Sequence, residues 1–301
     1  MSENRDSIHK TVLLNETIEG LNLSKDKESI VVDGTFGGGG HSFQLLKTYP
    51  KAKIIAIDQD KAVFEKAKDK FKGLEKRISF INTNFSKIDD LNDLENIDGI
   101  ILDLGLSSDQ LENSGRGFSF MKDEPLLMTM KENPLPDDLI AMDMVNNWGE
   151  KNLADIIYGY GEEKFSRGIA KAIVDARQKA EIKTTFELVK ILEKAVPGGY
   201  KKGKLHFATK TFQALRIAVN DELNVLKNGL ESCFKILKKG SRMSVISFHS
   251  LEDRIVKNFY RDMQKGGKAK IINKKVITAT LVEIRNNSRS RSAKLRVIEK
   301  I

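Results

Sequence analysis

Short apolar runs alternate with amphipathic stretches along the first third of this chain. The runs cover residues 30–33, 53–58, 77–82 and 97–103. Apolar runs of strand length, separated by segments with a helical spacing of apolar positions, predict βαβ units and a parallel sheet. The pattern therefore predicts an α/β fold.

A long helical segment separates the fourth run from the next, at 242–248. About 140 residues lie between these two runs, whereas a whole βαβ unit takes about 30. Apolar positions in the interval recur with the i, i+3, i+4 spacing of helices that bury one face. We therefore expect a discontinuous α/β domain, 1–115 with 209–301, and an all-helical domain, 116–208, inserted into it.

Two local patterns mark helices in and after this insert. Thr184 and Glu187 have the spacing of a capping box, which predicts a helix start. An apolar stripe between residues 212 and 237 predicts core helix that leads back to the sheet.

A glycine-rich turn follows the first run, and an acid ends the second. The turn reads Asp33-Gly34-Thr35-Phe36 followed by four glycines, 37–40, and the acid is Asp58. Glycines in such a turn let the backbone approach a ligand, and an acid at the next strand tip binds a ribose. The sequence predicts a cofactor that contains adenosine.

The glycine spacing narrows the choice of cofactor. No frame of residues 37–40 completes the G-x-G-x-x-G pattern of dinucleotide sites. Asp33 before the glycines suits a cationic amino-acid group and repels phosphate. This favours S-adenosylmethionine (AdoMet). A nicotinamide-dependent oxidoreductase and a surface turn without a ligand are the alternatives.

The charge distribution indicates a partner, and the cysteine and histidine content excludes some kinds of site. The formal net charge is +9, and residues 264–301 hold 11 Lys and Arg against two Glu. This C-terminal charge predicts contacts with RNA phosphates, the alternative being a solvated lysine-rich face.

The single Cys233 excludes an intramolecular disulfide, and the four histidines lack a metal-binding spacing, so no metal is expected. Without an apolar span or secretory leader we expect a cytoplasmic protein without membrane contact.

Asp103 ends the fourth run and is the acid best placed to meet a substrate. Ligands of open α/β sheets bind at the carboxyl ends of the strands. Asp103 is therefore expected either to contact a substrate amine or to cap the following turn.

Seven segments in fixed order resemble the bacterial 16S ribosomal RNA cytosine-N4 methyltransferases, the RsmH or MraW family. They are 33–42, 103–108, 116–120, 160–163, 212–220, 247–254 and 291–296. The resemblance implies a Rossmann-like class I AdoMet-dependent methyltransferase sheet with an inserted helical domain. It also implies methyl transfer by in-line displacement to the exocyclic N4 of a flipped-out cytosine in 16S ribosomal RNA, with the small ribosomal subunit as partner. Whether the chain is a monomer or a dimer stays open.

The resemblance also assigns residues to the site. It implies that AdoMet contacts Gly39, Gly40, His41, Asp58, Phe85, Asp103 and Gln110. Asp103 is in addition the candidate catalytic residue. The candidates for substrate binding are Ser107, Ser108, Arg116, Arg216, His249 and Arg254.

The chain departs from the family pattern at several positions, within residues 123–130 and 206–210. Leu127 and Thr129 stand where the pattern has an acid and an arginine. These differences put substrate contacts in question more than cofactor binding. They keep open the alternative of a non-catalytic RNA-binding factor in ribosome assembly.

Overall fold

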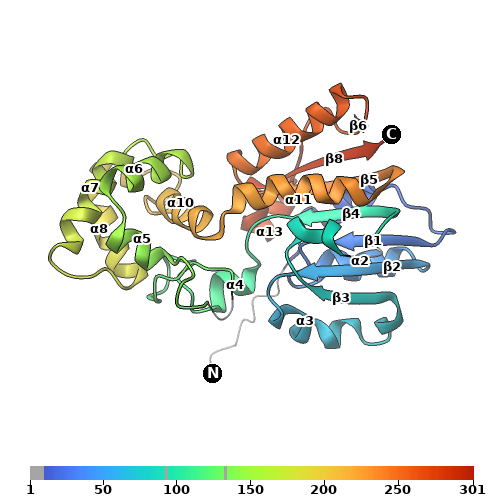
Figure 1. Ribbon diagram of the computed structural model, residues 1–301, viewed down its shortest axis with the longest axis horizontal. Coiled ribbons are helices and arrows are strands. Elements are labelled where there is room, and N and C mark those ends of the chain that lie inside the picture. The colour runs from blue at the N-terminus through green and yellow to red at the C-terminus, as the bar shows by residue number, and fades with distance from the viewer. Residues whose placement is uncertain (1–9, 92–93, 132–133) are drawn as a thin grey trace. The chain divides into compact units, whose positions relative to one another are not determined.

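The computed structural model describes residues 10–91, 94–131 and 134–301, with two compact units in one chain (Figure 1). The first unit comprises residues 1–105 and 223–301, and the second comprises 106–222. The second unit contains the expected insert, 116–208, and extends beyond it at both ends. The side chains of Ser108, Asp109 and Glu112 lie outside the described part.

The first unit is built on a sheet whose strands run in the order β3-β2-β1-β4-β5-β8-β6, with β7 paired to β8. The first five strands in that order are parallel to one another, and β8 is antiparallel to β5, β6 and β7. The strands are β1 (Ser29–Asp33), β2 (Ala52–Asp58), β3 (Ile78–Asn82), β4 (Ile97–Asp103), β5 (Leu237–Ser247), β6 (Ala269–Ile271), β7 (Ile277–Thr278) and β8 (Lys294–Lys300). The predicted parallel sheet is confirmed, whereas β6, β7 and β8 were not predicted.

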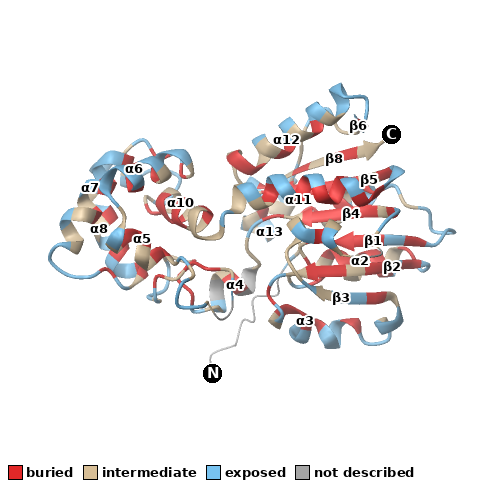
Figure 2. Cartoon of the chain, in the orientation of Figure 1, coloured by how far each residue is buried: buried red, intermediate tan, exposed pale blue. Residues whose placement is uncertain are grey.

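Helices cover both faces of this sheet. Val31 and Ile101 pack with helices α1, α2 and α3, while Val32 and Leu102 pack on the opposite face with α11 and α12. Because both faces are covered, the central strands are mostly buried, as the red colour of β1 and β4 in Figure 2 shows. The helices of this unit are α1 (Leu14–Gly20), α2 (Gly40–Thr48), α3 (Ala62–Ala67), α11 (Glu222–Ile236), α12 (Ser250–Lys265) and α13 (Leu281–Asn286), with 3₁₀ helices η1 (Lys68–Phe71), η2 (Glu75–Arg77), η3 (Phe85–Asp90) and η4 (Ser288–Ser292).

The second unit packs helices around its own core. Its helices are α4 (Ser108–Asn113), α5 (Ala141–Asn147), α6 (Glu150–Gly159), α7 (Ser166–Arg177), α8 (Thr185–Ala195), α9 (Gly198–Lys201) and α10 (Thr209–Asn220). The predicted capping box is present, because the Thr184 side chain accepts from the backbone N–H of Glu187. No helix in the described part of the chain is both long enough and apolar enough to span a membrane.

The apolar stripe between residues 212 and 237 forms two helices rather than one. α10 ends at Asn220, and Asp221 adopts a left-handed backbone with φ 47°. Aspartate tolerates this conformation better than most residues, so the chain can turn there before α11 begins. α11 is the crossover that leads into β5.

Candidate functional site

Three acids stand at the carboxyl ends of neighbouring strands. Asp33 ends β1, Asp58 ends β2 and Asp103 ends β4. β1 lies between β2 and β4, so the chain leaves β1 toward one side of the sheet and later continues on the other. Such a switch point is where open α/β sheets bind ligands. The geometry thus places all three acids at the expected edge.

Asp58 is fixed by the glycine turn. One carboxylate oxygen accepts from the backbone N–H of Gly37 at 2.8 Å, and the other accepts from Asp60 N–H at 2.9 Å. Burial raises the pKa of Asp58, while these backbone hydrogen bonds oppose the rise. The carboxylate is therefore oriented by the backbone before any ligand binds.

Asp33 faces inward. Its side chain accepts from Ser42 Oγ at 2.6 Å and from the Thr35 backbone N–H at 3.3 Å, and the residue is 2 % exposed. Burial raises its pKa to about 6. The sequence-based interpretation had Asp33 facing a cationic ligand group. The structure instead shows it joining the glycine turn to helix α2.

Asp103 carries an acceptor that the protein leaves unused. Its Oδ1 is buried and, among the described residues, has no hydrogen-bond partner. Its Oδ2 lies 3.8 Å from Nδ1 of His41. Burial, followed by the charges of Asp33 and Glu252, raises the pKa of Asp103 to about 8. A buried acceptor without a partner costs free energy, so it marks a place where a ligand can donate.

The glycines next to His41 make room for the protein's own side chains. A Cβ atom on Gly39, whose φ is +66°, would lie 2.6 Å from the Phe36 ring. A Cβ atom on Gly40 would lie 1.7 Å from Thr11 Oγ1. His41 itself is buried, with Nε2 3.2 Å from the carbonyl oxygen of Val12. Packing alone therefore requires glycine at positions 39 and 40.

Phe85 begins the 3₁₀ helix η3 and packs against α11. A Cβ atom on Gly229, within α11, would lie 2.1 Å from the Phe85 ring. Ser232 Oγ, one turn later in α11, donates to the carbonyl of Ser86 at 3.1 Å. Helix α11 thus sets the position of the ring that the family resemblance assigns to the adenine.

His249 is the N-cap of α12. Its Nδ1 accepts from the backbone N–H of Glu252 at 3.4 Å, and Glu252 Oε2 accepts from the backbone N–H of His249 at 3.3 Å. These contacts form a reciprocal capping box. Arg254 is exposed on the same helix. The structure therefore gives His249 a structural role, and its predicted contact with substrate stays a prediction.

Part of the basic C-terminal segment is paired within the protein. Arg296 Nε donates to Asp253 at 2.7 Å, and Lys294 Nζ lies 3.5 Å from the same carboxylate. Burial alone would raise the pKa of Asp253, but the hydrogen bond and charge of Arg296 lower it. These two cations lie in β8 and bind α12, whereas Arg285 and Arg291 are exposed. The charge available for RNA is thus smaller than the sequence indicated.

The two arginines of the second unit that were predicted to bind substrate contact other residues of the same unit. Arg116 is buried, donates to the carbonyl of Met130 at 2.9 Å and lies over the Phe118 ring. Arg216 forms two hydrogen bonds with the Glu222 carboxylate, at 2.7 and 2.8 Å. Both arginines therefore stabilise this unit, and substrate contacts stay a prediction.

Ser107 and Gln110 pair with each other at the start of α4. Ser107 Oγ accepts from Gln110 N–H at 3.2 Å, and Gln110 Oε1 accepts from Ser107 N–H at 3.0 Å. Gln110 is thus oriented by a capping box, and its predicted contact with the cofactor is untested. Ser108, the neighbouring candidate, has its side chain outside the described residues.

Two of the departures from the family pattern, Leu127 and Thr129, flank a fixed turn. Between Leu127 and Thr129, Met128 has a left-handed backbone with φ 54°. Its carbonyl accepts from Asn220 Nδ2 at 2.8 Å, and its N–H donates to the Arg116 carbonyl at 2.7 Å. Thr129 is 4 % exposed. The turn is therefore fixed by other residues of the unit.

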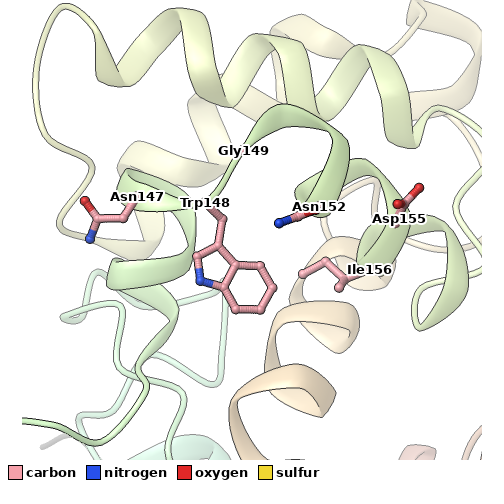
Figure 3. A pocket seen from close by; sticks show the side chains of 6 residues that line it. All are labelled: Asn147, Trp148, Gly149, Asn152, Asp155 and Ile156. Atoms are coloured by element: carbon pink, nitrogen blue, oxygen red, sulfur yellow. The ribbon is translucent and has the colours of Figure 1, made fainter.

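An open hollow of about 440 Å³, with a mixed polar and apolar lining, lies on the second unit (Figure 3). The indole of Trp148 forms one wall, with Ile156 beside it and the amide of Asn152 directed toward the space. The side-chain polar groups of Trp148, Asn147 and Asn152 have no hydrogen-bond partner among the residues that the structure describes. An aromatic face with free amides suits a flat, polar ligand.

Comparisons with known proteins decide the family. Residues 6–301 match the MraW methylase family. The chain belongs to the MraW methylase family. It is similar to the "Ribosomal RNA small subunit methyltransferase H" of Clostridium botulinum (strain 657 / Type Ba4), at 46 % identity over 97 % of this chain and 99 % of that one. The proteins of the same name from Persephonella marina (46 %, over 91 % and 94 %) and Lactobacillus johnsonii (42 %, over 97 % and 99 %) are also similar.

Membership in the MraW methylase family confirms the predicted enzyme class, an AdoMet-dependent methyltransferase. It rules out the nicotinamide-dependent oxidoreductase. The sheet order and its switch point agree with the predicted Rossmann-like fold.

Several residues at the edge of the sheet in this MraW methylase were not predicted. Thr35, Ser42 and Gly229 position Asp103, Asp33 and Phe85 respectively. Thr35 and Ser42 lie inside the glycine-turn motif, so their hydroxyls were a usable signal. Gly229 lies in an ordinary amphipathic helix, and nothing local in the sequence distinguishes it.

Proposed function

We propose that this MraW methylase transfers the methyl group of AdoMet to the exocyclic N4 of a cytosine in 16S ribosomal RNA. The single observation that carries the proposal is the unpartnered, buried Oδ1 of Asp103 at the end of β4. The curated relatives are named as methyltransferases of small-subunit ribosomal RNA, which supports the RNA substrate. The small ribosomal subunit, and with it the cytoplasm, is part of the proposal.

The residues of the first unit fit AdoMet. The Asp58 carboxylate, fixed by backbone N–H groups, would accept from the ribose hydroxyls, as acids at this strand tip do. Residues 39–41 would lie along the amino-acid part and Phe85 beside the adenine. When bound, AdoMet supplies an electrophilic methyl group on a sulfonium.

Asp103 would act on the incoming amine. The N4 lone pair of cytosine is delocalised into the ring, so the amine is a weak nucleophile. An Asp103 oxygen that accepts one N–H of the amine localises the lone pair and aligns it for in-line displacement. The same carboxylate can take the proton that the nitrogen loses after attack. A pKa of about 8 in the free protein suits a group that gains and loses a proton near neutral pH.

The positive charge of AdoMet matters for this step. A cation close to Asp103 favours the ionised carboxylate and lowers its pKa. Cofactor binding would therefore convert Asp103 from a mostly protonated group into the acceptor that the amine requires.

The second unit is proposed to bind the RNA around the target base. A base within a helix must leave its stack before its amine can be methylated. The hollow at Trp148 offers an indole for stacking and the amides of Asn147 and Asn152 for hydrogen bonds to a base. The exposed Arg285 and Arg291 of the first unit would contact phosphates.

A non-catalytic RNA-binding assembly factor is the competing function. Leu127 and Thr129 favour it, because an acid and an arginine of the family pattern are missing there. The unpartnered Asp103 oxygen favours catalysis, since a protein that only binds RNA gains nothing from a buried acceptor without a donor.

Methyl transfer from labelled AdoMet to purified small ribosomal subunits tests the proposal. We expect incorporation with the wild-type protein, its loss with Asp58→Ala through weak cofactor binding, and its loss with Asp103→Asn even at saturating AdoMet. Glu95→Gln, an exposed acid before β4, serves as control and should leave the rate unchanged. No incorporation by folded wild-type protein that binds AdoMet and RNA would establish the assembly factor instead.

A further inference from the structure

Residues 10–13 form a short strap before helix α1. Val12 and Leu13 are buried and pack with Ile246, Leu295 and Val297 of β5 and β8. Leu13 has a left-handed backbone with φ 48°, which is costly for a leucine and is maintained by its surroundings. The strap is therefore an ordered part of the first unit.

One side of the strap contacts the glycine turn. Thr11 lies so close to Gly40 that a Cβ atom there would come within 1.7 Å of its hydroxyl oxygen. The next residue, Val12, offers its carbonyl to His41 Nε2 at 3.2 Å. Since a carbonyl can only accept, the His41 nitrogen at this contact donates. The strap thus fixes both the backbone and the imidazole at the start of α2.

The other side of the strap is bound by the C-terminal segment. Glu283 Oε1 accepts from the Leu13 N–H at 2.8 Å, and Asn287 Nδ2 donates to the Lys10 carbonyl at 2.8 Å. Glu283 lies in α13 and Asn287 directly follows it. Two residues some 270 positions away in sequence therefore hold the strap against the glycine turn.

We infer that Glu283 and Asn287 are positioning residues for the cofactor site, acting through the strap on Gly40 and His41. The inference rests on the proposed placement of AdoMet at the glycine turn. A turn that is fixed before binding loses less conformational entropy when the ligand arrives. Release of the strap leaves the turn free to move and weakens AdoMet binding, although neither residue needs to contact the cofactor.

Asn287→Asp removes the contact with the strap but retains the local hydrogen bond of this side chain. The Asn287 side chain also accepts from the Arg289 N–H at 3.3 Å, and an aspartate retains that acceptor while losing the donor to Lys10. Asn286→Asp introduces the same charge at the neighbouring exposed position, where the asparagine side chain has no hydrogen-bond partner among the described residues. Glu283→Gln weakens the second contact, because a neutral amide oxygen is a poorer acceptor than a carboxylate.

Isothermal titration of AdoMet into the full-length variants measures the effect. Loss of one hydrogen bond predicts a Kd about three- to tenfold higher for Asn287→Asp, a smaller rise for Glu283→Gln and no change for Asn286→Asp. Unchanged melting temperatures without AdoMet would show that the loss is not general unfolding. Wild-type affinity in both Asn287→Asp and Glu283→Gln would overturn the inference.

Amide hydrogen exchange without AdoMet separates this inference from the proposed function. Amides of residues 36–42 should exchange about threefold faster or more in Asn287→Asp than in Asn286→Asp, because the turn opens more often. Equal exchange in the two variants would overturn the role of the strap, whether or not the wild-type protein binds AdoMet. Failure of the wild-type protein to bind AdoMet would count against the proposed function instead.

Discussion

The backbone N–H of Asp103 donates a hydrogen bond to the Thr35 hydroxyl at 2.6 Å. This contact joins the turn after β1 to the end of β4, the two segments that border the switch point of the sheet. The acceptor proposed for the substrate amine and the turn proposed for the cofactor are therefore part of one rigid edge.

Thr35→Val should loosen this edge. Valine has nearly the same shape but cannot accept, so the Asp103 N–H loses its partner at a cost of about 1–3 kcal/mol. We expect lower stability in urea and a lower methyl-transfer rate, whereas Thr35→Ser, which retains the hydroxyl, should stay close to wild type in both. Equal rates for the valine and serine variants would show that the contact is not needed.

The stability of the folded protein should fall as pH rises from about 5 to 8. Burial holds the pKa of Asp103 at about 8 and that of Asp33 at about 6, both above the ordinary value of 3.8. The folded state therefore retains protons that the unfolded state has lost. This stabilisation is complete at low pH and disappears as pH passes each folded-state pKa.

Asp103→Asn should remove much of that pH dependence. The variant cannot ionise at this position, so its free energy of unfolding should decline less between pH 6 and 8, by on the order of 1 kcal/mol per pH unit relative to wild type. Urea unfolding at pH 6, 7 and 8 measures the difference. Parallel curves for variant and wild type would contradict a buried, mostly protonated Asp103.

AdoMet affinity should rise with pH over the same range. A cation near Asp103 binds better to the ionised carboxylate, so below pH 8 the affinity can gain up to about tenfold per pH unit. Titrations at pH 6, 7 and 8 should show this slope in wild type and a flatter one in Asp103→Asn. A pH-independent wild-type Kd would place the charge of the cofactor away from Asp103.

Gly229→Ala should weaken AdoMet binding through Phe85. The new methyl group would lie 2.1 Å from the ring, so the ring or helix α11 must move. Overpacking of this kind costs about 1–3 kcal/mol of stability. Gly168→Ala in α7 is the matched control, since only a backbone oxygen at 3.9 Å is near, and it should be neutral or slightly stabilising. Unchanged AdoMet affinity in Gly229→Ala would remove Phe85 from the cofactor site.

The parallel half of the sheet could be predicted because each of its strands is a continuous apolar run. Residues 97–103 were predicted with the bounds that β4 has, and the other runs differ from their strands by a few residues. β8 was not predicted, because the charged residues of this segment indicated contacts with RNA phosphates rather than a strand. Its apolar residues, Leu295, Val297 and Ile298, are a recognisable strand signal, and Lys294 and Arg296 bind Asp253 rather than solvent.

Only those parts of the candidate site that depend on local sequence motifs could be predicted. The acids at the strand tips followed from the pattern, but what each carboxylate contacts depends on residues distant in sequence. Asp33 is turned inward by Ser42, and Gly40 is required by Thr11 of the strap. A family resemblance can name such positions, but the structure is needed to show which of them contact other residues of the protein.

Nucleoside analysis of 16S ribosomal RNA after reaction with the purified protein and labelled AdoMet tests the central claim most directly. Small subunits that lack the modification are the substrate, and Asp103→Asn is the matched inactive variant. We predict one labelled nucleoside, N4-methylcytidine, formed by wild type and absent with Asp103→Asn. A labelled methyl group on another base or another atom of cytosine, or equal amounts of N4-methylcytidine from both proteins, would contradict the account.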